Sequence, residues 1–399
     1  MTFVHLRPVL GPLLTTLLVQ TLVTGTALMP PVLVTLIAPD LGLGEGASGY
    51  WIALLYFGAV ASSFVAGRCI QALGALTVSL ASLVLSAAGL WLLALGALPL
   101  AVFGALVAGL GYGATTPASS EILARRTPPE IRALVFSLKQ TGVPLGGVLA
   151  GALGPSLALR LGWPAALALG GLAAVLAALA LLPLRRRLDE GPAQAGRARP
   201  KGLKLVLRDP PLRFVALSSF GFSAVQLCVT SYLVVLLVRR GDLDLVTAGI
   251  VFSAAQIAGV LGRIALGHLA DRSGRPALVL ATLGLASTLL LGAAGLMAPS
   301  WAFALKLGLG AALGLASLSW NGIFLAEVAR LAPVGQAGAV TGGTLAVTYA
   351  GVVVGPPLFA LALTGLGWEG ACLLAGGLGV MAAALILAAV PAEARRRPG

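Results

Sequence analysis

The sequence predicts an all-α integral membrane protein in which twelve transmembrane helices form two pseudo-symmetric six-helix halves. Three observations predict this fold: the composition, an internal repeat, and apolar runs of about 20 residues or more that recur to the end of the chain. Of the 399 residues, 58% are hydrophobic and 10% are charged, whereas roughly a quarter of an ordinary soluble domain is charged. So little charge could not cover a water-exposed surface, and each run is long enough to cross a bilayer as a helix.

Apolar runs bounded by charged residues, proline or glycine define the predicted spans. In the first half they lie near residues 9–37, 48–69, 75–96, 98–124, 132–158 and 163–184. In the second half they lie near residues 211–238, 245–269, 276–297, 300–329, 336–364 and 367–391. We expect helices, because backbone polar groups in lipid must pair within the segment and the runs lack the alternation of barrel strands. The first run is longer than the apolar core of a signal peptide, so we expect it to be the first span.

One long polar segment, residues 185–210, is rich in arginine, lysine, glycine and proline. It predicts a flexible, solvated cytoplasmic linker rather than a regulatory element. This linker divides an N-terminal half, residues 1–184, from a C-terminal half, residues 211–399.

Basic residues predict the orientation, because cytoplasmic loops of membrane proteins are enriched in lysine and arginine. With the N-terminus inside, the outer segments keep only Arg160, Arg239 and Arg240. The cytoplasmic segments then hold Arg7, Arg125, Arg126, Arg132, the linker cluster, Arg272, Arg275, Arg330 and Arg395 to Arg397. We therefore expect a multi-pass protein of the plasma (inner) membrane with both termini in the cytoplasm.

Charge and cysteine usage exclude several function classes. The formal charge is +13, but the basic residues lie in short segments between apolar runs without interleaved aromatic residues. They predict contacts with the headgroups of the lipid bilayer and no nucleic-acid partner. Cys69, Cys228 and Cys372 show no CxxC or histidine spacing, so neither a disulfide framework nor a zinc site is expected. His5 and His268 are the two histidines, and without a catalytic constellation we expect no enzyme activity, no metal and no cofactor.

An internal repeat relates the two halves. Residues 19–24 (VQTLVT) in the first span recur as residues 225–230 (VQLCVT) in the seventh. Residues 67–74 (GRCIQALG) recur as residues 267–274 (GHLADRSG), and Glu121 in the fourth span corresponds to Glu327 in the tenth. The offsets of these matches lie between 200 and 206 residues. Two parallel halves of this kind are a transporter arrangement, with the binding site predicted at their interface near mid-membrane.

The segment GHLADRSGR, residues 267–275, resembles the signature loop of the major facilitator superfamily. Together with the spans, the linker and the repeat, the resemblance covers the whole chain. It implies a cytoplasmic latch that helps to hold the outward-open state. The first-half copy has Gln71 in place of the aspartate, so gating is expected to be asymmetric. The residues that the resemblance and the repeat assign to gating are Gly267, Asp271, Arg272, Gly274, Arg275, Glu121, Glu327, Arg125 and Arg330.

The fifth span carries KQTGVPLGG, residues 139–147, which resembles the antiporter motif of this superfamily. Glycine and proline also allow close packing and a slight kink in many membrane helices, and this is the interpretation we favour. The same run resembles the branch that includes cyanate-permease-like and other anion carriers.

Three basic residues lie inside predicted spans, where charge is costly and therefore indicates function: Lys139, Arg263 and Lys306. Arg263 resembles the eighth-span arginine that binds carboxylate in oxalate/formate and monocarboxylate carriers. A planar guanidinium matches a carboxylate with two parallel hydrogen bonds. The alternative for all three is a long side chain that reaches the membrane interface, and for Lys306 this alternative is favoured.

Neutral polar residues complete the predicted binding site. Gln20 and Gln226 occupy equivalent positions of the first and seventh spans, and each amide offers donors and an acceptor. Hydrogen bonds between packed helices are the alternative role. The lower-ranked candidates are Tyr56, Gln256, Asn321 and Tyr349.

These features predict a secondary active or facilitated transporter that moves a small, carboxylate-like anion by alternating access. Basic residues without a matched deep carboxylate favour an anionic solute, since their charge would otherwise lie unpaired in a low dielectric. Efflux of drugs or amphipathic compounds by antiport is the alternative. We expect a small-molecule substrate, with a proton or a counter-anion as coupling partner, and the family resemblance implies a monomer.

Overall fold

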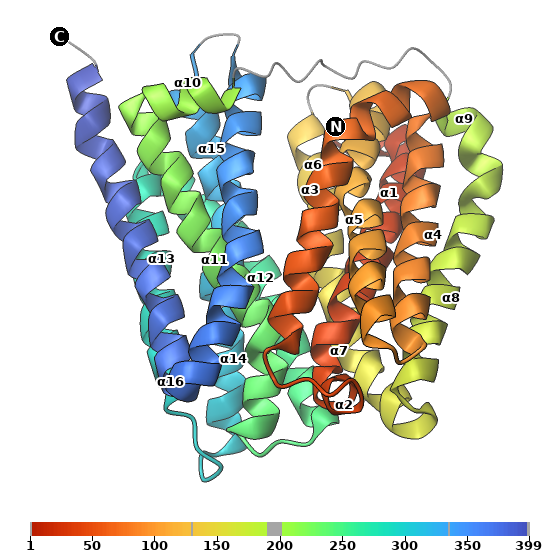
Figure 1. The fold of residues 1–399 in the computed structure, drawn as a ribbon. Coiled ribbons are helices and arrows are strands. Elements are labelled where there is room, and N and C mark those ends of the chain that lie inside the picture. The colour runs from red at the N-terminus through yellow and green to blue at the C-terminus, as the bar shows by residue number, and fades with distance from the viewer. Residues whose placement is uncertain (1, 129–130, 190–201, 334–335, 397–399) are drawn as a thin grey trace. The chain divides into compact units, whose positions relative to one another are not determined.

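The computed structural model describes residues 2–128, 131–189, 202–333 and 336–396, and every regular element in these ranges is a helix. The chain forms two compact units, one of residues 1–44 and 54–197 and the other of residues 45–53 and 198–399 (Figure 1). The boundary between the halves falls in the predicted linker. The side chains of Arg7 and of Arg395 to Arg397, used to predict the orientation, lie outside the described residues.

The first unit contains the first six predicted spans. Two of the six are each divided into two helices, and short helices follow the sixth. The bounds are α1 Thr2–Val32, α2 Val34–Asp40, α3 Ala47–Leu73, α4 Ala75–Ala94, α5 Leu98–Arg126, α6 Arg132–Gln140, α7 Gly142–Leu161, α8 Trp163–Leu181, the 3-10 helix η2 Leu182–Leu184 and α9 Arg185–Asp189. The first residues of α3 group with the second unit.

The second unit contains the last six predicted spans. Its helices are α10 Gly202–Arg208, α11 Pro210–Arg239, α12 Leu245–Ser273, α13 Pro276–Gly295, α14 Phe303–Leu318, α15 Trp320–Leu331 and α16 Ala337–Arg396. The last of these is two helices that meet at Gly367, whose φ of 68° lies in the left-handed region that favours glycine. Gly367 thus separates the predicted eleventh and twelfth spans.

Within the described residues, 11 helices are long and apolar enough to cross a membrane, and the last is a segment of 56 residues that contains two spans. The prediction of twelve helical spans is confirmed. Large apolar side chains point outward from these helices, with Phe64 81% exposed, Leu289 75% and Ile264 67%. Contact of such apolar surfaces with lipid tails costs no free energy, whereas their exposure to water would be unfavourable.

The two units repeat the same close helix packing. In the first unit, a Cβ on Gly109 of α5 would collide with the Leu55 carbonyl of α3; in the second, a Cβ on Gly314 of α14 would collide with the Ala255 carbonyl of α12. Glycine at these positions lets two backbones touch, which is how membrane helices gain packing energy. The contacts are related by nearly the same offset as the sequence repeat.

The predicted linker is helical at both ends. Asp189 at the end of α9 accepts hydrogen bonds from the backbone N–H groups of Leu76 and Thr77, at 2.6 and 3.2 Å, and so caps the start of α4. In the second unit, Gly202 of α10 packs against the Ala339 carbonyl of α16. The two ends of the predicted linker are therefore helical and packed rather than extended loop; residues 190–201 lie outside the described residues.

Candidate functional site

The tenth span, which belongs to the second unit, is broken into two helices. Helix α14 ends at Leu318 and α15 begins at Trp320, with Ser319 between them. The Ser319 hydroxyl donates to the Leu315 carbonyl at 2.5 Å, and such back-bonding by serine bends helices. The neighbouring helix α12 approaches this point closely, because a Cβ on Gly262 would collide with the Ser319 hydroxyl. The break therefore lies directly beside α12.

Arg263 of α12 reaches this break. Its Nε donates to the Leu318 carbonyl at 2.8 Å, and the side chain is half-buried. The glycine just before it, Gly262, brings the α12 backbone near enough for this contact. This hydrogen bond orients the guanidinium. An oriented, charged fork in an apolar span is suited to binding an anion.

Gln226 of α11 meets the other side of the break. Its Oε1 accepts a hydrogen bond from Trp320 Nε1 at 2.8 Å and another from Asn321 Nδ2 at 3.1 Å. Both Gln226 and Asn321 are half-buried. Residues 318–321 thus connect three predicted candidates: Arg263 and Gln226 contact this segment, and Asn321 belongs to it.

Trp320 belongs to this group but was not among the predicted residues. It is 1% exposed, stacked on Phe222 with ring centroids 5.4 Å apart, and packed edge-on against Phe324. These contacts place it in the hydrophobic core of the second unit. An aromatic residue with a polar N–H, beside an asparagine in the middle of an apolar span, was the signal that could have identified it.

Two other predicted residues lie elsewhere in the second unit. Gln256 is buried on α12, about two turns before Arg263, and Tyr349 is half-buried on α16. Their roles as lining residues stay predictions.

In the first unit, Gln20 and Lys139 lie near a second helix break. Helix α6 ends at Gln140 and α7 begins at Gly142, and a Cβ on Gly142 would come within 2.9 Å of Gln20 Cβ. Lys139 is 1% exposed and its ammonium donates to Gln140 Oε1 at 3.2 Å. Among the described residues, the buried Oε1 of Gln20 has no hydrogen-bond partner. Buried polar groups of this kind are costly unless they serve a ligand or water.

The glycines of the antiporter-like run pack against α1. A Cβ on Gly146 would lie 2.5 Å from the Thr21 carbonyl oxygen and 2.6 Å from Gly25 N. The interpretation of this run as a close-packing helix face has this direct structural support.

Tyr56 of α3 pairs with Tyr112 of α5 in the same unit. The two hydroxyl groups lie 3.2 Å apart and the rings pack edge-on with centroids 5.2 Å apart. Tyr112 was not predicted from the sequence.

Lys306 is buried near one end of the second unit. It is 4% exposed, and its ammonium donates to the Gly241 carbonyl at 2.7 Å and the Pro299 carbonyl at 2.9 Å. Both acceptors lie in loops of the second unit, Gly241 in the loop after α11 and Pro299 in the loop after α13. These bonds join loops at one end of the unit.

Five of the predicted gating residues lie at the end of α12: Gly267, Asp271, Arg272, Gly274 and Arg275. Gly274 has φ of 61° and ends the helix in the left-handed conformation, while Asp271 and Arg275 are exposed beside it. A cavity of about 910 Å³ at this end is lined by Asp271, Arg275, Glu327, Arg330 and Glu393, together with small and apolar residues.

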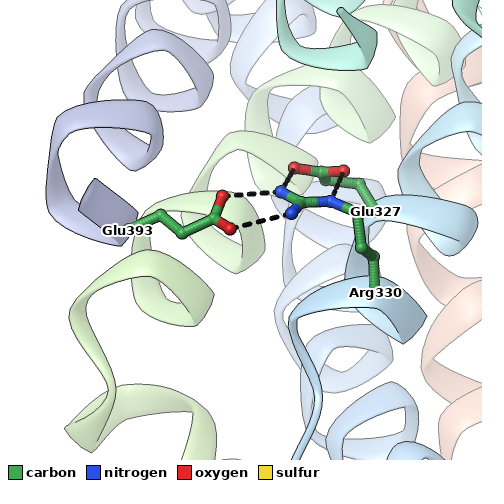
Figure 2. Close-up of polar contacts among 3 residues, drawn as sticks. All are labelled: Glu327, Arg330 and Glu393. Carbon is green, nitrogen blue, oxygen red and sulfur yellow. Dashed lines mark hydrogen bonds and ion pairs between the residues drawn. The ribbon is translucent and has the colours of Figure 1, made fainter. Parts of the chain in front are cut away.

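Ion pairs connect the gating carboxylates to arginines. Glu121 pairs with Arg125 at 2.8 Å in the first unit. In the second, the Arg330 guanidinium binds two carboxylates, Glu327 at 2.6 and 2.8 Å and Glu393 at 2.7 and 2.8 Å (Figure 2). Glu393, from the C-terminal helix, was not predicted because its contact depends on how that helix docks against α15.

Comparisons with known proteins agree with this architecture. A family model described as Major Facilitator Superfamily matches residues 13–344. A bacterial homologue of the human lysosomal transporter Spinster superposes with a TM-score of 0.74 at 16% identity, over 97% of this chain and 98% of its own. A D-xylose–proton symporter gives a TM-score of 0.71 at 18% identity, over 95% and 97%. At these identities the structures show the fold alone.

Three curated relatives share more sequence. The 3-(3-hydroxy-phenyl)propionate transporter of Escherichia coli is 30% identical over 187 residues, 44% of this chain and 43% of that protein. The hexuronate transporter of Bacillus subtilis is 25% identical, covering 70% of each chain. The gallate transporter of Pseudomonas putida is 26% identical over 42% of this chain and 44% of its own. The matches to the first and third relatives thus span less than half of those proteins' length.

Proposed function

The chain belongs to the major facilitator superfamily of membrane transporters, and we propose that it carries a small organic carboxylate across the plasma (inner) membrane by alternating access. Both termini are cytoplasmic in this proposal, and the protein acts as a monomer. The substrate binds on residues 318–321 and the side chains around them, with Arg263 as the carboxylate ligand.

The observation that carries this proposal is the position of Arg263. A guanidinium inside an apolar span is costly and therefore indicates function, and the hydrogen bond to the Leu318 carbonyl orients it at the same helix break that the Gln226 amide contacts. A carboxylate matches the guanidinium in charge and shape, because the guanidinium fork can hold it with two parallel hydrogen bonds.

The relatives support an organic acid as substrate. Their printed names are transporters of 3-(3-hydroxy-phenyl)propionate, hexuronate and gallate, which are all carboxylates. A carboxylate with a proton or a counter-anion as coupling partner agrees with the lack of a predicted deep acidic residue in the spans.

Arg263→Gln tests the proposal directly. Purified protein is screened by thermal unfolding against carboxylates, inorganic anions and cationic drugs, because a ligand that binds the folded state raises the Tm. We expect stabilisation by at least one carboxylate, and its loss in Arg263→Gln with the unliganded Tm retained. Arg213→Gln is the matched control, since Arg213 is exposed on α11. Stabilisation by several unrelated cationic drugs and by no carboxylate would support efflux instead.

A further inference from the structure

The side-chain amides of Gln226 and Asn321, here called the amide pair, have a fixed orientation. Indole N–H is only a donor, so the Gln226 atom that faces Trp320 Nε1 at 2.8 Å is the oxygen. The Asn321 atom that lies 3.1 Å from this oxygen is therefore the nitrogen. Neither amide can be turned over without losing a hydrogen bond.

Trp320 holds the amide pair rigidly. It is 1% exposed, and it is packed between Phe222 and Phe324, which are 4% and 1% exposed. A close-packed indole of this size cannot change rotamer without opening the core. The direction of its N–H, and hence of the Gln226 amide, is set by the core of the second unit.

The fixed orientation decides which groups remain for a ligand. Both lone pairs of Gln226 Oε1 are used, so Gln226 Nε2, Asn321 Oδ1 and the second N–H of Asn321 remain for other partners. Within the part of the chain that the structure describes, neither Gln226 Nε2 nor Asn321 Oδ1 has a hydrogen bond to the protein. Both residues are half-buried, which leaves the two atoms within reach of a solute.

We propose that the amide pair forms hydrogen bonds with a hydroxyl group of the substrate. The substrate is then a hydroxylated carboxylate. A hydroxyl has one hydrogen and two lone pairs, which matches one free acceptor, Asn321 Oδ1, and the N–H donors of Gln226. A second carboxylate would face the Asn321 oxygen and be repelled, and a hydrogen or methyl group would leave Gln226 Nε2 and Asn321 Oδ1 without a partner in the ligand. The carboxylate half of this inference rests on the function proposed for Arg263; the hydroxyl half rests on the amide pair.

Matched ligands test the inference by binding to the purified protein. The pairs are 3-(3-hydroxyphenyl)propionate against 3-phenylpropionate, and 3-hydroxybenzoate against benzoate, with 3-carbamoylbenzoate as the amide probe. We expect each hydroxylated acid to bind about tenfold to a hundredfold more tightly than its parent, since an unpaired buried polar group weakens binding by that factor. Equal binding of acid and hydroxy acid, or tighter binding of the amide probe, overturns the inference.

Two variants locate the effect. Gln226→Met removes the amide while keeping the length of the side chain, and we expect the preference for the hydroxyl to fall to less than threefold while the parent acid still binds. Trp320→Phe tests positioning, because it removes the N–H that fixes the amide, together with part of the buried ring volume, and it should reduce the same ratio. Thr230→Val is the control, since Thr230 donates to the Gln226 main-chain carbonyl one turn away and not to the amide.

The two proposals fail in different ways. If the wild-type protein binds carboxylates without preferring the hydroxylated ones, only the hydroxyl inference is wrong. If it binds no carboxylate of either kind, both proposals are wrong. An unchanged preference in Gln226→Met, with the parent acid still bound, removes the amide pair from the site even if Trp320→Phe fails to fold.

Discussion

Lys306 has contacts from which we expect a structural role for a charged side chain inside a span. Its ammonium donates to two loop carbonyls, of Gly241 and Pro299, and the side chain is 4% exposed. We expect Lys306→Met to lower the free energy of unfolding by about 1–3 kcal/mol, because both carbonyls lose a charged donor. Thermal unfolding in detergent measures this as a lower Tm.

Lys306→Arg is the control for charge, since it restores donors to the same carbonyls. Carboxylate binding by any Lys306 variant that folds should stay at the wild-type level. A Lys306→Met protein with normal Tm and abolished binding would assign Lys306 to the substrate site.

At the scale of single residues, the sequence identifies polar side chains inside the spans but not what they touch. Arg263, Gln226 and Asn321 are recognisable because polar groups in apolar runs are costly. Trp320 is not identified from the sequence because aromatic residues are common in spans. Its role depends on a hydrogen bond to Gln226, which lies 94 residues away in the sequence. Glu393 is missed for the same reason, since its partner Arg330 lies 63 residues away.

Among elements, the contact of α12 with α14 depends on one glycine. A Cβ on Gly314 would collide with the backbone carbonyl of Ala255, whereas one on Gly308 of the same helix meets nothing within 4 Å. We expect Gly314→Ala to lower the free energy of unfolding by about 1–3 kcal/mol, because the helices must separate.

Gly308→Ala is the matched control and should leave stability unchanged or slightly higher, because alanine favours helix over glycine. Thermal unfolding of the two variants side by side makes the comparison. Equal Tm values for both would show that α12 and α14 do not meet as closely as described.

The junction of α15 with the end of α16 depends on Arg330. Its partner Glu327 is 5% exposed, while Arg330 and Glu393 are nearer the surface (Figure 2). We expect Arg330→Met to be destabilising by about 1–3 kcal/mol, since it leaves a buried carboxylate without its partner. Glu393→Gln should cost less than about 1 kcal/mol, because the buried pair remains.

Urea or thermal unfolding of both variants ranks the two effects, and the order is the test. A larger loss in Glu393→Gln than in Arg330→Met would contradict the assignment of the buried pair as the stabilising contact.

The extent of each element is predictable because its signals are local. Apolar runs end at glycine or charge, and the structure places spans close to the predicted ranges. A slight kink is expected from the glycines and proline near Thr141, but the break at Ser319 is not predictable in this way. Serine and threonine occur in many unbroken membrane helices, and whether one bends its helix depends on neighbours such as Gly262 that approach in the folded protein.

For the molecule as a whole, the repeat predicted from three short matches is also a repeat of contacts. Gly146 of α7 packs on the Thr21 carbonyl of α1, and Gly351 of α16 packs on the Phe220 carbonyl of α11. Together with Gly109 and Gly314, these glycines give both units the same helix packing. The polar groups differ between units, with Arg263 and the amide pair in the second and Lys139 and Gln20 in the first. Substrate recognition is therefore expected to depend more on the second unit.

Uptake into proteoliposomes tests the central claim most directly. Purified wild-type protein and Arg263→Gln are reconstituted in parallel, and accumulation of a panel of labelled carboxylates is measured, with Arg213→Gln as control. We predict that at least one carboxylate accumulates with wild type and Arg213→Gln, and that Arg263→Gln reduces its initial rate to less than about a tenth, because one charged hydrogen-bonding partner contributes that much or more to binding. Uptake of no carboxylate, or an unchanged rate in Arg263→Gln, would contradict the account.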